Sequence, residues 1–283
     1  MRRLLHAALL LTLFLAVAPA GAQRGVIEAA GIAFACWFES APDSCGFAEQ
    51  SKGAGRVSLV RVAGMNGVRL HTRPGDSHVY GSRDAERSDL ALSQRASDCY
   101  EGREHWWAHS VLFPDDYVAP PESTATDWYF GVVADFHNTA PGAGQANFQV
   151  NAMPATAMSP DRPTGLGFQI AYGDQQRPSL YHAPIGPVVK NAWYHFVYHV
   201  RWSSAAGGYF DAWVNGAQKM TYRGPTLYPG QGCYFKLTNY HSAFGKPSSV
   251  IHARVVRGST PGAVSAGPLE GLFHLRQASR SGR

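Results

Sequence analysis

The fold of this chain is decided by the stretch Cys233-Tyr234-Phe235-Lys236-Leu237-Thr238-Asn239-Tyr240-His241. Side chains of a β-strand alternate between its two faces. One face of this stretch carries Cys233, Phe235 and Leu237 and is suited to a core. The other face carries Tyr234, Lys236, Thr238 and Tyr240, with no apolar companion. Such a face is either solvated or lines a groove that receives a polar, anionic ligand.

The stretch 132–137 divides in the same way. Its alternation predicts that Val132, Ala134 and Phe136 point to the core, while Asp135 and His137 point to the other face. A carboxyl group and an imidazole therefore join the phenols on a polar face.

Two further stretches agree with this division. Residues 147–152 alternate an amide with an apolar side chain, which places Asn147, Gln149 and Asn151 on one face. Residues 87–92 place Arg87 and Asp89 on one face and leucines on the other. A guanidinium oriented by a neighbouring acid can bind a carboxylate, although a surface salt bridge is the commoner role of such a pair. Together these stretches predict a sheet with one apolar and one polar face.

The chain as a whole reads as all-β. Short alternating runs recur between turn signals, and no run has a helical period after the first 22 residues. We therefore predict a β-sandwich jelly roll of two antiparallel sheets, one of them concave with a groove. The expected strands are 68–71, 86–92, 105–113, 129–137, 147–152, 167–172, 193–202, 209–215, 232–240 and 250–257. Long loops are expected at 114–127, 139–146 and 173–189.

The first 22 residues have the features of a secretory signal peptide. Arg2 and Arg3 precede an apolar run at 4–17, and Ala20-Gly21-Ala22 forms a cleavage site. We expect a secreted or periplasmic protein with one domain at 23–260, no membrane anchor after signal removal, and a loosely held tail at 261–283.

The charge of the exported chain is mild. The 25 Lys and Arg residues, less the two arginines of the signal segment, give 23 basic against 20 acidic residues, a net charge of +3. This balance suits an acidic substrate and lacks the strongly basic footprint of a nucleic-acid-binding protein.

Four cysteines are present, at 36, 45, 99 and 233. An even count in an oxidising compartment suggests two disulfides, for which three pairings exist. We favour Cys36–Cys45, which closes a short loop, with Cys99–Cys233, which joins two expected strand starts. The spacing fits no zinc site, and we expect neither a metal nor a cofactor.

Three motifs resemble those of the jelly-roll polysaccharide lyases, a group that includes alginate lyases, heparin lyase I and glucuronan lyases, and they occur along the chain in the same order as in that group. The motif Tyr-Phe-Lys-x-x-x-Tyr at 234–240 resembles their terminal strand, and Arg-Ser-Asp-Leu at 87–90 resembles their Arg-Ser-Glu-Leu strand. Asp-Phe-His at 135–137 stands where they carry Gln-x-His. The resemblance extends over residues 81–258.

The resemblance implies a secreted lyase, expected to be a monomer, that cleaves a uronic-acid polysaccharide by β-elimination. His137, Tyr240 and Arg87 are then the catalytic residues. Imidazole titrates near neutral pH and is a natural base, the phenol is a suitable acid, and the guanidinium can hold the carboxylate. The substrate-binding residues expected on the same grounds are Asp89, Asp135, Asn147, Gln149, Tyr234 and Lys236.

The sequence departs from the family pattern at three positions. Thr238 replaces a Gly two residues before Tyr240, Ser242 replaces a Gln two residues after it, and the third departure is at residue 135. Asp135 replaces the neutralising Gln, and an ionised Asp repels a uronate carboxylate. Either Asp135 is protonated, or Gln149, Asn147 or Asn151 takes the role. A non-catalytic glycan-binding sandwich is the alternative function. A retaining glycosidase is a distant third, because no close pair of carboxylates shares a strand face.

Overall fold

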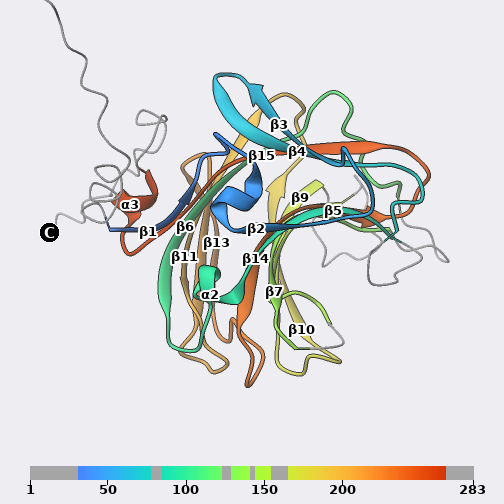
Figure 1. Ribbon diagram of the computed structural model, residues 1–283. Helices are drawn as coiled ribbons and strands as arrows, with labels where there is room; N and C mark the ends of the chain where they lie inside the picture. The colour runs from blue at the N-terminus through green and yellow to red at the C-terminus, as the bar shows by residue number, and fades with distance from the viewer. Residues whose placement is uncertain (1–30, 78–84, 123–128, 141–143, 154–164, 266–283) are drawn as a thin grey trace, which may run out of the picture.

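The computed structural model describes residues 31–77, 85–122, 129–140, 144–153 and 165–265, and in these residues the strands form two sheets packed face to face (Figure 1). The proposed signal peptide and most of the proposed tail lie outside the described residues. Every pair of neighbouring strands is antiparallel. The predicted all-β sandwich is therefore confirmed.

The eight-stranded sheet has β15 near its middle, paired with β6, β4 and also β1. Its strands in spatial order are β13 (Ala217–Arg223), β12 (Tyr209–Val214), β11 (Trp193–Arg201), β6 (Glu104–Leu112), β15 (Ser248–Gly258), β4 (Met65–Thr72) and β3 (Val57–Val62), with β1 (Ile32–Cys36) added on β15.

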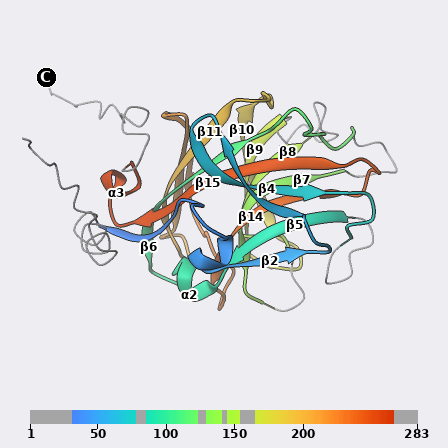
Figure 2. The same ribbon diagram turned by 45° about the horizontal axis from the view of Figure 1, so that its top comes forward.

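The seven-stranded sheet has β14, which contains the stretch quoted at the outset, between β7 and β5. Figure 2 shows β5 and β14 running side by side in this layer. Its strands in spatial order are β10 (Ser179–Gly186), β9 (Gly165–Tyr172), β8 (Phe148–Met153), β7 (Gly131–Asn138), β14 (Cys233–Ser242), β5 (Ala85–Leu92) and β2 (Phe47–Ser51).

Helix is confined to three short pieces within the described residues: η1 (Pro42–Cys45), α2 (Gln94–Ser97) and α3 (Pro261–Ser265). Ser93 caps α2, because its hydroxyl accepts a hydrogen bond from the backbone N–H of Ala96. The α3 helix contacts β15 and β6, and its Ala263 and Val264 are buried. None of these helices is long and apolar enough to cross a bilayer.

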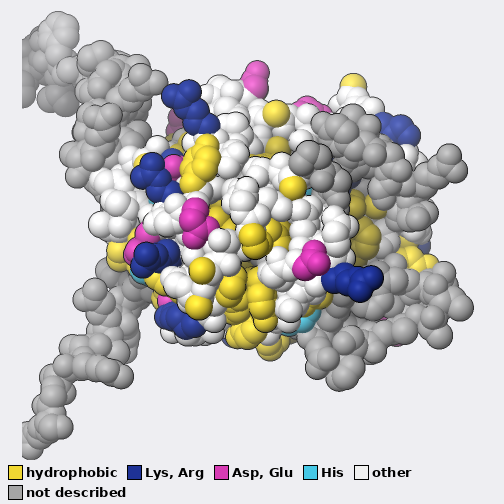
Figure 3. All heavy atoms as spheres, turned by 90° about the horizontal axis from the view of Figure 1, so that it is seen from below, with side chains coloured by type: hydrophobic (Ala, Val, Ile, Leu, Met, Phe, Trp, Pro, Cys, Tyr) yellow, Lys and Arg dark blue, Asp and Glu magenta, His cyan; other side chains and the backbone are white. Residues whose placement is uncertain are grey.

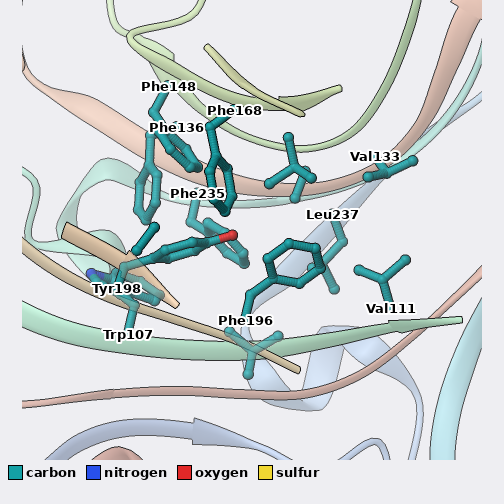
Figure 4. Close-up of a cluster of buried hydrophobic side chains, with 14 of the residues drawn as sticks. Trp107, Val111, Val133, Phe136, Phe148, Phe168, Phe196, Tyr198, Phe235 and Leu237 are labelled. Carbon is teal, nitrogen blue, oxygen red and sulfur yellow. The ribbon is translucent and has the colours of Figure 1, made fainter. Parts of the chain in front are cut away.

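The core between the sheets is rich in aromatic rings (Figure 4). Phe136 of β7 lies at its centre, where its ring centroid is 5.0 Å from that of Phe235, 5.3 Å from that of Trp107 and 4.8 Å from that of Trp202. Burying one such side chain contributes roughly 1.5–3 kcal/mol to stability. Because the rings come from both sheets, they fix how one sheet sits on the other.

Both expected disulfides are confirmed. Cys36 is joined to Cys45 with a Cα separation of 5.6 Å, and Cys99 is joined to Cys233 with a Cα separation of 5.0 Å. Cys233 is the first residue of β14, so the second bridge anchors this strand to the segment that leads into β6.

Two expectations about the strands are wrong. The segment 173–189 is not a continuous loop, because it contains β10. This strand lies at an edge of its sheet and contains Pro184, which is tolerated at edges and obscures the strand signal in the sequence. Val132 does not point to the core. A β-bulge between Val132 and Ala134 reverses its direction, so Val133 fills the core and Val132 faces outward.

The surface carries mixed charge. On the face seen in Figure 3, Lys and Arg side chains are interspersed with Asp and Glu. This pattern agrees with the modest net charge of the whole chain, +5.

Candidate active site

A groove of about 600 Å³ lies on the outer face of the seven-stranded sheet. The alternation that sends Phe136, Phe148 and Phe235 into the core turns the polar residues of the same strands toward this groove. Its polar strand residues are Arg87 from β5, Asp135 and His137 from β7, Gln149 and Asn151 from β8, Gln169 from β9 and Tyr240 from β14.

Tyr240 lies between two partners in the groove. It is the register partner of Arg87 on β5, and the guanidinium carbon of Arg87 is 4.0 Å from the centroid of the phenol ring. Phe130 meets the same ring edge to face, with the centroids 4.9 Å apart. The ring is therefore held in place while its side chain remains partly exposed to the groove.

An amide lies in the same cross-strand row as this phenol. On its other side Tyr240 pairs with Val132, and Val132 pairs in turn with Asn151. Asn151 lines the groove, and its side-chain oxygen is buried without a hydrogen-bond partner in the described residues. The row Arg87, Tyr240, Val132 and Asn151 thus presents a guanidinium, a phenol and an amide to one part of the groove.

Asp89 and Lys236 form a buried ion pair beside this row. Lys236 Nζ is 2.6 Å from an oxygen of Asp89, and the side chains are 2% and 0% exposed. The hydroxyl of Thr238 donates to Asp89 Oδ1. Arg87 Nε lies 3.2 Å from Asp89 Oδ2, the same oxygen that Lys236 contacts. Neither Asp89 nor Lys236 lines the groove. The expectation that Asp89 and Lys236 contact substrate is therefore not supported. The two side chains form an ion pair with each other, and Asp89 also orients Arg87.

His137 stacks on Tyr234, with ring centroids 5.4 Å apart. Its Nδ1 lies 3.0 Å from the backbone oxygen of Asn138. A carbonyl can only accept, so Nδ1 carries the hydrogen and Nε2 is left as an acceptor. His137 lines the groove, whereas Tyr234 does not.

The register separates His137 from Tyr240. His137 is opposite Tyr234 on β14, and Tyr240 is opposite Val132. The five residues from Val132 to His137 correspond to about 16 Å of strand. Both side chains line one groove, at separate positions in the strand register.

Asp135 lines the groove between these two positions. It is 4% exposed, and its Oδ1 is buried without a hydrogen-bond partner in the described residues. Burial raises the pKa of this carboxyl, opposed mainly by the positive charge of Lys236. Its register partners are Lys236 on β14 and Gln149 on β8.

On the β8 and β9 side of Asp135, the groove is lined mainly by amide side chains. Gln169 Nε2 donates to the side-chain oxygens of both Gln145 and Gln149, at 3.1 Å each. Because these oxygens are occupied, Gln145 and Gln149 have their NH2 groups left to bind a ligand.

The sequence missed part of this lining. Gln169 falls on the polar face of an expected strand, so alternation could have identified it. No pattern marked the loop residues Gln145, Gln175 and Gln176. Asn147 was expected in the groove but is fully buried outside it, because β8 begins one residue later, at Phe148. No cluster of His, Cys, Asp and Glu suited to a metal ion is found among the described residues.

The solved structures similar to this chain include carbohydrate-active enzymes. An endo-β-1,4-glucuronan lyase from the fungus Trichoderma reesei matches with a TM-score of 0.56 and 17% identity, over 76% of this chain and 92% of that one. The alginate lyase Aly36B matches with a TM-score of 0.47 and 11% identity, over 80% and 96%. These likenesses concern the fold. A search of curated proteins found no match.

A family model described as polysaccharide lyase matches residues 39–256. The match covers most of the sandwich and includes each of the groove-lining residues from Arg87 to Tyr240. The chain belongs to the polysaccharide lyase family.

Proposed function

We propose that this protein is an exported lyase that cleaves a uronic-acid-containing polysaccharide by β-elimination at Tyr240. The observation that carries this proposal is the cross-strand row in which Tyr240 stands between the guanidinium of Arg87 and the amide of Asn151, inside an open groove. Export is supported by the signal-like first 22 residues and by two disulfides.

The reaction needs one proton removed and one supplied. The C5 proton passes to a base, its electron pair forms the C4=C5 double bond, the C4–O4 bond breaks, and O4 takes a proton. Tyr240 as phenolate takes the C5 proton and, as the resulting phenol, returns a proton to O4 on the same side of the sugar. General acid–base catalysis of this kind typically increases the rate by roughly 10²–10⁴-fold.

Arg87 and Asn151 stabilise the charge that this chemistry develops. When C5 loses its proton, negative charge spreads onto the uronate carboxylate, and a guanidinium and an amide N–H group favour that charge. No metal enters this account, because the chain's own side chains perform each step.

His137 serves a neighbouring sugar in this scheme. In the strand register it stands opposite Tyr234 and not opposite Tyr240. Its Nε2 is an acceptor for a sugar hydroxyl, while the NH2 groups of Gln145 and Gln149 donate to sugar oxygens.

The test is ultraviolet absorbance of the C4=C5 double bond, which forms only by elimination. Glucuronan is the first polymer to try, since the lyase of similar fold acts on it; alginate and heparin-like polymers complete the panel. Absorbance that rises with the native protein and not with Tyr240→Phe supports the proposal. Binding to a polymer without any absorbance increase would instead identify a glycan-binding module.

A further inference from the structure

Asp135 is an unusual group to find in a groove for an anion. It is the one acidic side chain among the described residues that line the groove. It is 4% exposed, and its Oδ1 has no hydrogen-bond partner in the described part of the chain. An ionised carboxylate in that position would lack its usual partners and would also repel a uronate.

The two cations nearest Asp135, Lys236 and Arg87, already share the Asp89 carboxylate as a partner. Lys236, opposite Asp135 on β14, lies 2.6 Å from Asp89, and Arg87 lies 3.2 Å from the same carboxylate. Two cations and the Asp89 carboxylate leave one positive charge in this cluster. If Asp135 is neutral, this positive charge remains available to attract an anionic substrate. If Asp135 is ionised, its negative charge cancels it.

The remaining neighbours of Asp135 are donors or neutral groups. Gln149 on β8 has its side-chain oxygen occupied by Gln169, so its free group is the NH2. His137, two residues along β7, and Tyr240 on β14 are further titratable groups of the groove, and Nδ1 of His137 donates to a backbone carbonyl. A neutral carboxyl group would add one more donor to a surface that already offers donors to an anion.

We propose that Asp135 works as an uncharged carboxylic acid whose O–H donates a hydrogen bond to the carboxylate of the bound uronate, and that its ionisation weakens substrate binding as the pH rises. The inference rests on the proposed function and deepens it, because it assigns the position where similar lyases carry an amide. A protonated carboxyl and an amide both present one oxygen and one hydrogen-bond donor, so they can fill the same role.

The electrostatic surroundings point the same way. Burial raises the pKa of Asp135, and the nearby Asp89 adds to this rise, while Lys236, His137 and Arg87 oppose it. Because burial is the largest of these effects, the neutral form persists to higher pH than in an exposed aspartate.

The test compares Asp135→Asn with the native protein on the polymer that the native protein cleaves. The amide donates at every pH, so the ratio of kcat/KM at about pH 8 to that at about pH 5.5 should rise at least ten-fold relative to the native ratio. Asp135→Glu, which keeps an ionisable group, should retain a decline toward high pH. Asp135→Ala should raise KM at both pH values.

An ionised Asp135 that is needed for activity predicts a different result for Asp135→Asn. If Asp135 acts as a carboxylate, Asp135→Asn should lower kcat/KM by more than about 100-fold at both pH values while circular dichroism and thermal melting remain native. That outcome would overturn the inference and leave the role of Tyr240 intact, because Tyr240→Phe tests that role separately.

A second measurement does not depend on turnover or on a variant that folds. The carboxyl carbons of ¹³C-labelled aspartates can be followed by NMR in the native protein from about pH 4 to about pH 9. The Asp135 signal should titrate above those of the exposed aspartates, and addition of glucuronate oligosaccharide should move its midpoint higher. A carboxyl already ionised at the acid end of this range would overturn the inference.

Discussion

At the scale of single residues, the site divides its charged groups into those that face substrate and those that support them. Tyr240 and Arg87 face the groove, whereas Asp89 and Lys236 are buried beside it. Asp89 binds Lys236 and lies close enough to Arg87 to hold the guanidinium over the phenol ring. A buried ion pair adds little net stability in general, but here it fixes the direction of a third charge.

Breaking this pair should be costly. Lys236→Met leaves the buried Asp89 carboxylate with Arg87 as its one remaining cation, so we expect a loss of about 3 kcal/mol in the free energy of unfolding. Urea titration measures this loss. Lys246→Met, which removes an exposed lysine, is the matched control and should change stability by less than about 0.5 kcal/mol. Equal effects from the two variants would mean that the buried pair has no special role.

His137 should affect binding more than chemistry. Its register partner is Tyr234 and not Tyr240, so His137→Ala should raise KM about ten-fold and lower kcat far less. Steady-state kinetics on a polymer that the native protein cleaves gives KM and kcat separately. A fall in kcat as deep as that of Tyr240→Phe would return His137 to the reaction centre.

At the scale of the elements, β14 is the strand on which the site depends. It pairs with β5 and β7, which carry Arg87, Asp135 and His137. Its first residue, Cys233, is tied to Cys99, which is 134 residues earlier in the sequence. The covalent bridge therefore holds the start of this strand against the segment between α2 and β6.

The two disulfides should differ in their contribution to stability. In the chain-entropy account, closing a loop of 134 residues stabilises by about 5 kcal/mol, and closing one of nine residues by about 3 kcal/mol. Replacing both cysteines of Cys99–Cys233 with serine should thus lower the free energy of unfolding more than replacing Cys36 and Cys45. Denaturant unfolding of the two double variants checks the order, and a reversed order would contradict this account.

The faces of the strands could be predicted from the sequence, but their register could not. Alternation correctly placed the core residues of β14, β5 and β8, such as Phe235, Leu90 and Phe148. It failed at Val132, because a β-bulge adds a residue that no local pattern reveals. It also gave no means of knowing that His137 lies opposite Tyr234. Pairing depends on which strand lies alongside, and that is a property of the whole fold.

At the scale of the whole molecule, several histidines are buried and neutral. Burial lowers the pKa of His252 to about 4 and pushes that of His109 well below its ordinary value. In the unfolded chain these groups take up protons near the usual 6.5. Their contribution to stability is therefore complete above that pH and is lost as the pH falls toward the folded-state value. Burial raises the pKa of Glu86, so its contribution runs the other way and is lost as the pH rises.

The stability of the protein should accordingly fall in acid. We expect the melting temperature to decline as the pH is lowered from about 6.5 to about 4, with His252 alone contributing on the order of 3 kcal/mol to the change. His252→Gln removes the titration and should flatten the decline, whatever it does to stability at neutral pH. Calorimetry at a series of pH values measures both slopes. Identical slopes for the two proteins would show that His252 is not buried neutral.

The central claim is that Tyr240 performs the proton transfers of a β-elimination, and one measurement tests it most directly. The initial rate of ultraviolet absorbance increase is measured with the native protein and with Tyr240→Phe on a uronate polymer that the native protein cleaves. The variant keeps the ring between Arg87 and Phe130 and loses only the hydroxyl, so KM should stay within a few-fold while kcat falls about 1,000-fold or more. A variant that turns over within a few-fold of the native rate would contradict the account.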